Sequence, residues 1–276
     1  MNKFILFLLF LLNSTSTFAG DYITGGWSQS LTAIPKPGMT TVMYGMITNL
    51  KGLTVGTATS PGWSVKTTPA PLISGSSLWS YGGAGCAPVG MPETADDIDN
   101  AVSATNDQCW DGIDIDNECG MNSDTIIKLI NKMKWKQTSY TFMGGHDFNH
   151  PEQSEDGETA NNEVLKIHKY SKVDRFILMM YGDEMWPMED VVANVGPGMK
   201  RLLDMGIDKK KIIATVTTDG LTVENLNHVI DQVLKLDVGG LFIWNYEFLS
   251  DSHLNIINTR LSISNGAKSL KLKGSK

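Results

Sequence analysis

The chain has 276 residues, a formal net charge of −7 and three cysteines. The acidic balance argues against a nucleic-acid partner, because binding to nucleic acid depends on basic patches. Three cysteines are too few for a fold built on disulfides, so a hydrophobic core must hold the chain together.

Residues 1–19 predict a secretory signal peptide. Lys3 is followed by an unbroken apolar run from Phe4 to Leu12, and small or polar residues precede a cleavage site after Ala19. The run is too short to span a bilayer, which takes about 20 apolar residues. We therefore predict an exported protein, extracellular or periplasmic, that has no membrane segment once the leader is removed.

Strand-like runs alternate with helical patterns along the rest of the chain. The predicted strands span residues 22–27, 41–47, 77–82, 109–118, 139–143, 175–181, 211–216 and 240–246. The predicted helices span residues 124–133, 162–170, 189–205 and 223–236, and the polar stretch 146–162 is predicted to be a rim loop. Eight strands with intervening helices favour one α/β domain over residues 20–265, closed as a (β/α)₈ TIM barrel.

The competing fold is an open, doubly wound sheet. That fold normally has a phosphate-binding glycine loop after an early strand. The sequence Gly-Gly-Ala-Gly at residues 82–85 is a weak match to such a loop. The barrel is therefore the prediction, followed by a basic tail over residues 266–276 that we expect to be solvated.

The fourth predicted strand carries a row of acids. Asp114, Asp116 and Glu118 stand two residues apart, with Ile113 and Ile115 between them. Side chains alternate faces along a strand, so the three carboxyl groups point one way and the isoleucines point toward flanking helices. A solvated edge strand is the alternative. Stacked like charges are costly, and a chain retains them mainly where they have a function.

This row resembles the signature of glycoside hydrolase family 18, the chitinases and related endo-β-N-acetylglucosaminidases. The matching pattern is Asp111-x-x-Asp114-x-Asp116-x-Glu118. Three other strands carry motifs similar to the family's, namely Ser80-Tyr81-Gly82-Gly83, Met179-Met180-Tyr181 and the Gly-x-x-x-Trp run at residues 240–244. The small size and the ending Glu118-Cys119-Gly120 look nearest the single-domain plant-type chitinases, and no inserted α+β module precedes the eighth strand.

The resemblance implies retaining hydrolysis assisted by the substrate. Glu118, at the end of its strand and so at the rim, would protonate the glycosidic oxygen. The sugar's own 2-acetamido oxygen would attack the anomeric carbon and give an oxazolinium intermediate. Asp116 would hold the acetamido N–H, and Asp114 would tune Asp116, because adjacent shielded carboxyls resist full ionisation.

The same resemblance assigns the supporting residues. Tyr181 would donate its hydroxyl to the acetamido oxygen, and Trp244 would form the apolar floor under the sugar. Further substrate contacts are expected from Met179, Asp183 and Trp186. Structural support is expected from Asp111, Ser80, Gly82 and Gly83.

Three positions depart from the family pattern. Gly182 follows Tyr181 where the family often has Asp or Asn, and Asp183 comes one residue later. Asn117 stands where many members carry an aromatic or apolar residue, and the second strand lacks the usual Ala-Phe. These departures leave the contacts of Asp183 and part of the sugar-binding floor open.

The cysteines and histidines allow two further predictions. Cys109 and Cys119 lie at opposite ends of one strand, about 33 Å apart, so we predict a Cys86–Cys119 disulfide and a lone thiol at Cys109. His146 and His150 flank Asp147 in a pattern that can bind zinc, but without helical spacing. Rim hydrogen bonding is favoured, and no metal or cofactor is expected.

Two classes of function stay open at this point. The first is an enzyme that cleaves β-1,4-linked N-acetylglucosamine in chitin, N-glycan cores or peptidoglycan fragments. The second is a non-catalytic chitin-binding lectin on the same fold, since a fold does not fix a function. The presence of Glu118 favours the enzyme. The predicted partner is an N-acetylglucosamine-containing saccharide, with no nucleic acid and no membrane, and the predicted state is a monomer.

Overall fold

The computed structural model describes residues 22–55, 62–84, 94–118 and 120–261. Its strands are β1 (Ile23–Ser28), β2 (Thr41–Asn49), β3 (Thr54–Val55), β4 (Ser76–Gly82), β5 (Gly112–Asn117), β6 (Gln137–Met143), β7 (Arg175–Met179), β8 (Ile212–Thr217) and β9 (Gly240–Trp244). The helices are α1 (Ala95–Asp107), α2 (Ser123–Lys132), α3 (His146–Asn149), α4 (Glu155–Tyr170), α5 (Met188–Asp204) and α6 (Val223–Leu236), followed by a helix over residues 251–261.

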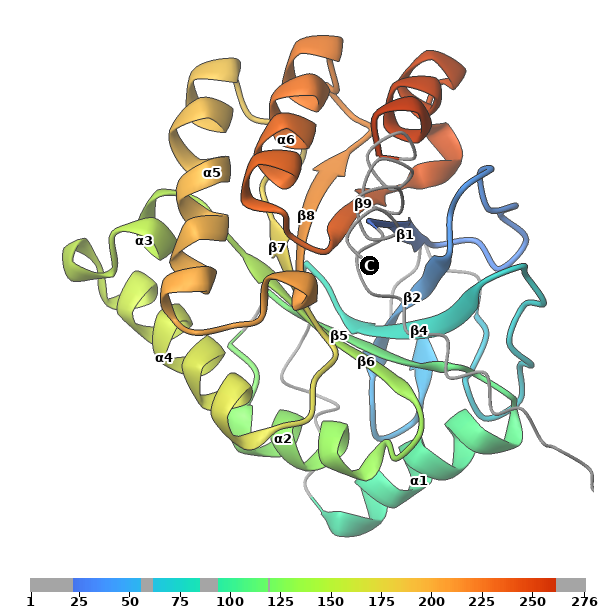
Figure 1. Ribbon diagram of the computed structural model, residues 1–276. Helices are drawn as coiled ribbons and strands as arrows, with labels where there is room; N and C mark the ends of the chain where they lie inside the picture. The colour runs from blue at the N-terminus through green and yellow to red at the C-terminus, as the bar shows by residue number, and fades with distance from the viewer. Residues whose placement is uncertain (1–21, 56–61, 85–93, 119, 262–276) are drawn as a thin grey trace, which may run out of the picture.

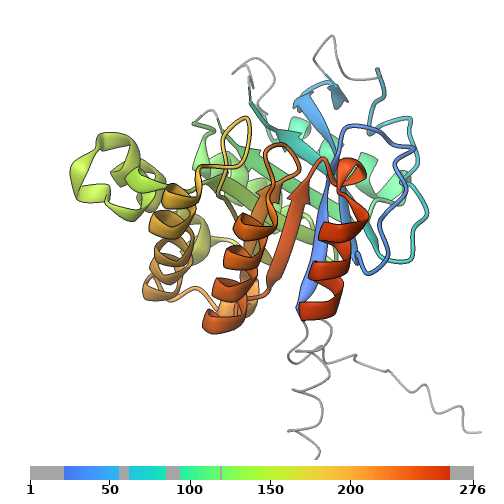
Figure 2. The ribbon, with the colours of Figure 1, turned by 90° about the horizontal axis from the view of Figure 1, so that it is seen from above.

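The sheet closes on itself. The strand order is β1-β9-β8-β7-β6-β5-β4-β2, and β1 also pairs with β2, so the sheet has no open edge between its first and last strands. All these pairings are parallel, whereas the short β3 adds to the end of β2 in antiparallel fashion. Helices pack on the outside of the strands over most of the barrel, and loops cover the side of β2 and β4 (Figures 1 and 2). The structure therefore confirms a single (β/α)₈ barrel.

Successive side chains of a strand point alternately into the barrel and toward the helices, so the hydrophobic core has two parts. One cluster fills the interior of the barrel, with Trp27, Met43, Ile177 and Phe242 among its members. A larger cluster lies between the strands and the surrounding helices. Ile113 and Ile115 belong to this outer cluster and are fully buried, as predicted. The carboxyl groups between them therefore face the barrel interior.

Several predicted boundaries were wrong. The predicted strand at 109–118 begins later, at Gly112, because Cys109 takes a positive φ of 59° in the turn before it. The predicted rim loop at 146–162 was also wrong. It holds α3 and the first half of α4, whose N-cap Ser154 accepts a hydrogen bond from the Gly157 amide.

Besides α3, two helices were not predicted from the sequence. They are α1, which begins with a capping box between Thr94 and Asp97, and the helix over residues 251–261. The buried side of α1 consists mainly of small and polar side chains, so its apolar period is weak. The helix over 251–261 buries Leu254, Ile257 and Leu261 at helical spacing, and this signal was missed.

Some predictions concern residues outside the described ranges. They are the signal peptide over residues 1–19, the tail over residues 266–276 and the Cys86–Cys119 disulfide. Cys109 is exposed and carries a free thiol, as predicted. Within the ranges that the structure describes, no helix has both the length and the apolar character needed to cross a bilayer.

Candidate active site

Three neighbouring strands bring polar side chains together inside the barrel. Ser80 of β4 and Ser139 of β6 both lie in register with Asp114 of β5. One step further along the strands, Asp116 lies in register with Gly82 on one side and Thr141 on the other. Because parallel strands share their direction, this polar strip rises toward the C-terminal end of the barrel, where barrel sites lie.

Asp114 is fully buried and accepts four hydrogen bonds. Its Oδ2 accepts from Trp27 Nε1 at 2.9 Å and from Ser80 Oγ at 2.6 Å. Its Oδ1 accepts from Ser139 Oγ and Thr141 Oγ1, both at 2.8 Å. Burial raises the pKa of Asp114, and these hydrogen bonds oppose that rise. A carboxylate has about four acceptor positions, so this one is saturated and rigidly held.

Asp116 lies in a different environment. It is also buried, yet its Oδ1 has no hydrogen-bond partner in the structure. Burial, and after it the charges of Glu118 and Asp114, raise the pKa of Asp116 well above its ordinary value. A buried polar atom without a partner is rare in folded proteins and marks a place where a ligand can bind. Asp116 is therefore a group prepared to hold a polar ligand.

Glu118 stands at the rim, one residue beyond the end of β5. Burial of the carboxyl raises the pKa of Glu118, and a hydrogen bond from the Ala84 backbone partly offsets that rise. The acidic row thus changes character along its length, from a saturated carboxylate at Asp114 to an accessible carboxyl at Glu118. A raised pKa at an accessible carboxyl is the property that a proton donor needs near neutral pH.

A cleft of about 540 Å³ opens above the acids. Asp116 and Glu118 line it, together with Met179, Tyr181, Asp183 and Trp244 from the strands and loops on the other side of the barrel. Burial, and then the charges of Asp116, Glu118 and Asp114, raise the pKa of Tyr181 well above its ordinary value, so its hydroxyl keeps its proton.

Trp244 ends β9, is half-buried and lines the cleft. It is in register with Trp27 of β1, and the centroids of the two rings are 6.4 Å apart. Trp27 in turn donates to Asp114, so Trp27 connects Trp244 to the acidic row. The predicted site residues at β5, β7 and β9 are therefore brought to one cleft.

Gly82 and Gly83 shape the side of the cleft next to Asp116. Gly82 has a φ of +115°, and a Cβ there would lie 2.0 Å from the Asp116 carbonyl oxygen. Gly83 has a φ of +83° and donates its N–H to the same oxygen at 3.0 Å. Both glycines allow β4 to approach the backbone of Asp116 closely.

Replacement of Gly82 by Ala is expected to lower the free energy of unfolding by about 2 kcal/mol or more, because the methyl group meets backbone and the φ is unfavourable. Urea titration of the wild type and the variant measures this. Gly206 has a φ of +85°, but a Cβ at this position would meet nothing within 4 Å, so Gly206→Ala is the control for the backbone effect alone. Equal losses in the two variants would contradict the proposed close approach.

A second cavity of about 390 Å³ adjoins the cleft, and Glu118 and Met143 line both. Asn117 lies at its base, where its Nδ2 donates to Tyr140 Oη at 2.9 Å and to Glu163 Oε2 at 3.2 Å. Asn117 Oδ1 accepts from the Met121 amide at 2.9 Å. Asn117 stands where many family 18 members carry an aromatic or apolar residue. Here its hydrogen bonds connect β5 to Glu163 of α4.

The remaining predicted residues lie outside the cleft. Trp186 is half-buried, packs on the outer hydrophobic cluster and does not line the cleft. Asp111 is exposed, but its Oδ2 accepts from the Ser77 amide at 2.8 Å and so joins β4 to the start of β5. Trp186 nevertheless lies beside the cleft, since its Nε1 would be 3.9 Å from a Cβ at Gly182, which lines the cleft.

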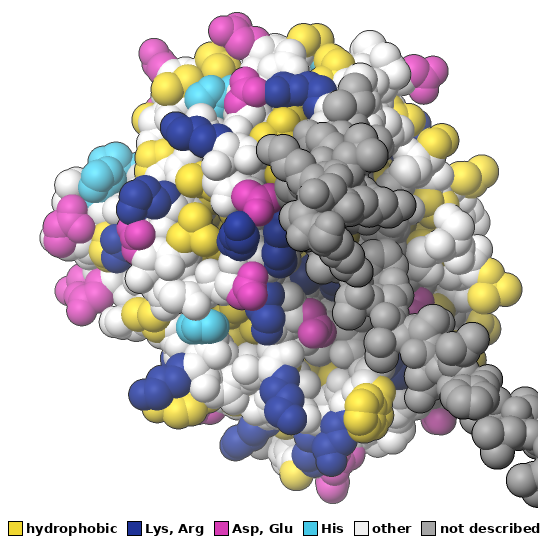
Figure 3. Space-filling model, in the orientation of Figure 1, with side chains coloured by type: hydrophobic (Ala, Val, Ile, Leu, Met, Phe, Trp, Pro, Cys, Tyr) yellow, Lys and Arg dark blue, Asp and Glu magenta, His cyan; other side chains and the backbone are white. Residues whose placement is uncertain are grey.

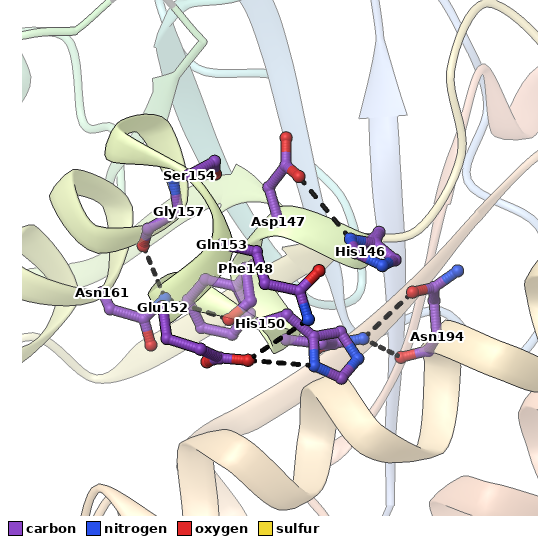
Figure 4. Close-up of polar contacts among 11 residues, drawn as sticks. His146, Asp147, Phe148, His150, Glu152, Gln153, Ser154, Gly157, Asn161 and Asn194 are labelled. Carbon is purple, nitrogen blue, oxygen red and sulfur yellow. Dashed lines mark hydrogen bonds and ion pairs between the residues drawn. The ribbon is translucent and has the colours of Figure 1, made fainter.

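His146 and His150 lie on the exposed α3 segment, with ring centroids 4.8 Å apart (Figure 4). His146 is 3.6 Å from the Asp147 carboxylate, and His150 is 3.5 Å from that of Glu152. Among the described residues, no group of three or more His, Cys, Asp or Glu side chains has an arrangement suited to a metal ion. The contacts of this segment are hydrogen bonds and close histidine–carboxylate approaches at the rim.

Three donors to Asp114 were not predicted from the sequence, namely Trp27, Ser139 and Thr141. A signal for two of them was present, because Ser139 and Thr141 stand two residues apart on a predicted barrel strand and so share its interior face. No such signal marked Trp27. Its position opposite Asp114 depends on the closure of β1 onto β2 and β9.

Comparison with known proteins gives a clear result for the fold. No family model matches the sequence, and no curated protein matches it either. Solved structures do match. A GH18 chitinase from Pseudoalteromonas aurantia superposes with a TM-score of 0.62 at 15% sequence identity, covering 86% of this chain and 99% of that one.

Two further structures show the same likeness. The catalytic domain of a family GH18 chitinase from the fern Peteris ryukyuensis has a TM-score of 0.57 at 15% identity, covering 87% of this chain and 99% of that one. A chitinase domain from Pyrococcus furiosus, complexed with chito-oligosaccharides, has a TM-score of 0.54 at 12% identity, covering 81% and 83%. The chain therefore has the fold of the family 18 chitinases, including the plant-type catalytic domains.

Proposed function

We propose that the protein is a glycoside hydrolase that cleaves β-1,4-linked N-acetylglucosamine in chitin or chito-oligosaccharides. The observation that carries this proposal is the graded row of carboxyls beneath the cleft. Asp114 is saturated with hydrogen bonds, Asp116 is buried with one oxygen unpartnered, and Glu118 is accessible at the rim. This gradation matches three different tasks in hydrolysis assisted by the substrate.

Glu118 is the proposed general acid. It lies at the rim beside the cleft, where a glycosidic oxygen can reach it, and burial raises the pKa of its carboxyl. The proton passes from Glu118 to the leaving-group oxygen as the bond to the anomeric carbon breaks. The resulting carboxylate then takes a proton from the water that completes hydrolysis.

Asp116 is the proposed partner of the substrate's 2-acetamido group. Its unpartnered Oδ1 can accept the acetamido N–H, which holds the acetamido oxygen toward the anomeric carbon. That oxygen forms the new bond and gives an oxazolinium ion whose positive charge lies next to Asp116. Water then opens this ion with overall retention of configuration. Positioning of an internal nucleophile in this way can supply much of the rate enhancement.

Tyr181 and Trp244 complete the proposed site. The Tyr181 hydroxyl keeps its proton, because burial and three nearby carboxyls raise its pKa, and it can donate to the acetamido oxygen. The indole of Trp244 offers an apolar face in the cleft for the C–H face of a pyranose. Met179 and Asp183, which line the same cleft, are proposed as further substrate contacts.

We also propose that the protein is exported to the extracellular space or periplasm, that residues 1–19 are removed, and that it acts as a monomer. The apolar run behind Lys3 supports export. The described residues form one continuous barrel, which needs no second copy to complete the cleft.

The test is hydrolysis of a fluorogenic chitotrioside by the chain that begins at Gly20. We expect release of the fluorophore, and we expect NMR to detect the β-anomer of the product first, as retention requires. An α-anomer as first product would contradict the proposed mechanism. A chitobiose-core N-glycan and a peptidoglycan fragment, assayed in parallel, identify the substrate class. Binding of chito-oligosaccharides without hydrolysis of any substrate would assign the protein to the lectin class.

A further inference from the structure

The end of the barrel opposite the cleft presents a second surface of unusual composition. Here α2 and α4 end, and the loops after them lead into β6 and β7. The two loops are joined, because Asn131 Nδ2 donates to the Tyr170 carbonyl at 2.9 Å and the Lys172 amide donates to Asn131 Oδ1 at 3.1 Å. Segments 132–136 and 169–174 therefore form one continuous surface, which we name the basic aromatic face.

This face is cationic in an acidic protein. Its charged residues are Lys132, Lys134, Lys136, Lys169 and Lys172, with Asp174 as the acidic member of the two segments. Lys and Arg side chains gather over this end of the molecule (Figure 3). The whole chain has a formal net charge of −7, so this face is opposite in sign to the chain as a whole. Such asymmetry favours an anionic partner.

The charges on the face differ in how far they are neutralised. Lys132 pairs with Asp99, and the Asp174 carboxylate accepts from Thr138. Lys134 and Lys172 are exposed and form no ion pair with any residue in the described ranges. Two ammonium groups are therefore free to meet an anion without first breaking a contact within the protein.

Trp135 lies at the centre of this face and is fully exposed, with a φ of +66°. A bulky residue with positive φ is uncommon, and an indole exposed to water forgoes the stabilisation of burial. Trp135 borders a groove of about 510 Å³ whose apolar lining includes Ile130 and Met133, with lysines at its edge. Tyr170, 56% exposed, lies nearby with the Lys169 ammonium 5.0 Å from its ring centroid.

We propose that the basic aromatic face docks on an anionic lipid bilayer. Exposed indole and phenol rings flanked by lysines match the interface of a membrane, where aromatic rings sit at the level of the headgroups and lysines contact anionic phosphates. The apolar groove distinguishes this face from a surface for a soluble polyanion, which would need the charges but no apolar element. The proposal stands apart from the hydrolase proposal, because it involves none of the residues of the cleft.

Docking of this kind would leave the cleft open. The basic aromatic face lies at the N-terminal ends of the parallel strands, whereas Glu118, Tyr181 and Trp244 lie at their C-terminal ends. The bound protein would turn its cleft away from the bilayer. Leu261 lies at the same end as the face, and the sequence after it carries Lys268, Lys271, Lys273 and Lys276.

The test is sedimentation of the chain beginning at Gly20 with vesicles of phosphatidylcholine, with or without phosphatidylglycerol. We expect binding only to the anionic vesicles and weakening by salt. Lys134→Glu with Lys172→Glu should lower affinity by roughly fivefold or more for each lysine, equivalent to about 1 kcal/mol each. Trp135→Ala should lower it by about tenfold and abolish a blue shift of the tryptophan emission on binding.

The matched controls carry the same changes elsewhere. Lys66→Glu with Lys128→Glu reverses two exposed lysines outside the two segments and alters the net charge equally. Phe248→Ala removes an aromatic side chain that is 74% exposed. We expect both controls to bind like the wild type. Absence of binding to anionic vesicles would overturn the proposal. Lysine-dependent binding to heparin or duplex DNA, with no effect of Trp135→Ala, would overturn it in favour of a soluble polyanion.

Discussion

Glu118→Gln is expected to lower kcat on a chitotrioside by about 10²- to 10⁴-fold, the usual contribution of a general acid. Glutamine keeps the shape of the side chain but has no proton to give. KM should change little, because the cleft, the Trp244 floor and the buried acids are untouched. Steady-state kinetics measure both constants, and thermal unfolding checks that the variant is folded.

The identity of the leaving group sharpens this test. A substrate with a dinitrophenolate leaving group needs little protonation, so Glu118→Gln should retain far more activity on it than on a natural glycoside. Asp147→Asn serves as the control, because Asp147 lines the adjoining cavity and is exposed but does not line the cleft. Wild-type rates for Glu118→Gln on both substrates would exclude Glu118 as the acid.

Asp116→Asn is expected to lower kcat by about 10²- to 10³-fold while it makes the protein more stable at neutral pH. The loss follows from replacing the carboxylate that faces the oxazolinium charge. The gain in stability follows from relief of a buried carboxyl among like charges, and we expect about 1–3 kcal/mol in the free energy of unfolding. Urea titration at pH 7 measures this quantity.

The pH dependence of stability follows from the same pKa. Burial, then Glu118 and Asp114, raise the pKa of Asp116, so between the unfolded and folded pKa values the folded protein binds more protons than the unfolded chain. Stability then falls as the pH rises from about 4, the ordinary carboxyl range, through the folded pKa. Asp116→Asn should remove this decline, so its stability advantage over the wild type should grow with pH.

Asp183→Asn is the stability control, since it removes an exposed carboxylate from the same rim. Its stability relative to the wild type should hardly change between pH 4 and pH 8. Destabilisation of the protein by Asp116→Asn at pH 7 would contradict the raised pKa of Asp116. It would also contradict the inference that this carboxyl serves catalysis at the expense of stability.

The alternation of side chains along single strands was enough to predict much of the barrel. The period of two along residues 113–118 separated the acids from Ile113 and Ile115, because backbone geometry alone sets which side chains share a face. The placement of Tyr181 and Trp244 beside Glu118 was expected from the resemblance of their strand-end motifs to family 18, and both residues line the cleft with Glu118. The start of α4 was misplaced because a polar first turn hides the apolar period, although Ser154 signalled the cap.

The eight barrel strands and the inward row of Asp114, Asp116 and Glu118 could be predicted from the chain alone, whereas α1, α3 and the helix over residues 251–261 were missed. The strands and the row depend on strand periodicity and on residues that are near in sequence. Three features could not be predicted in this way: Trp27 donates to Asp114, Asp116 Oδ1 lacks a partner, and segments 132–136 and 169–174 form one cationic face. Burial, pKa and surface charge depend on closure of the barrel, because closure brings residues far apart in sequence to within a few ångströms.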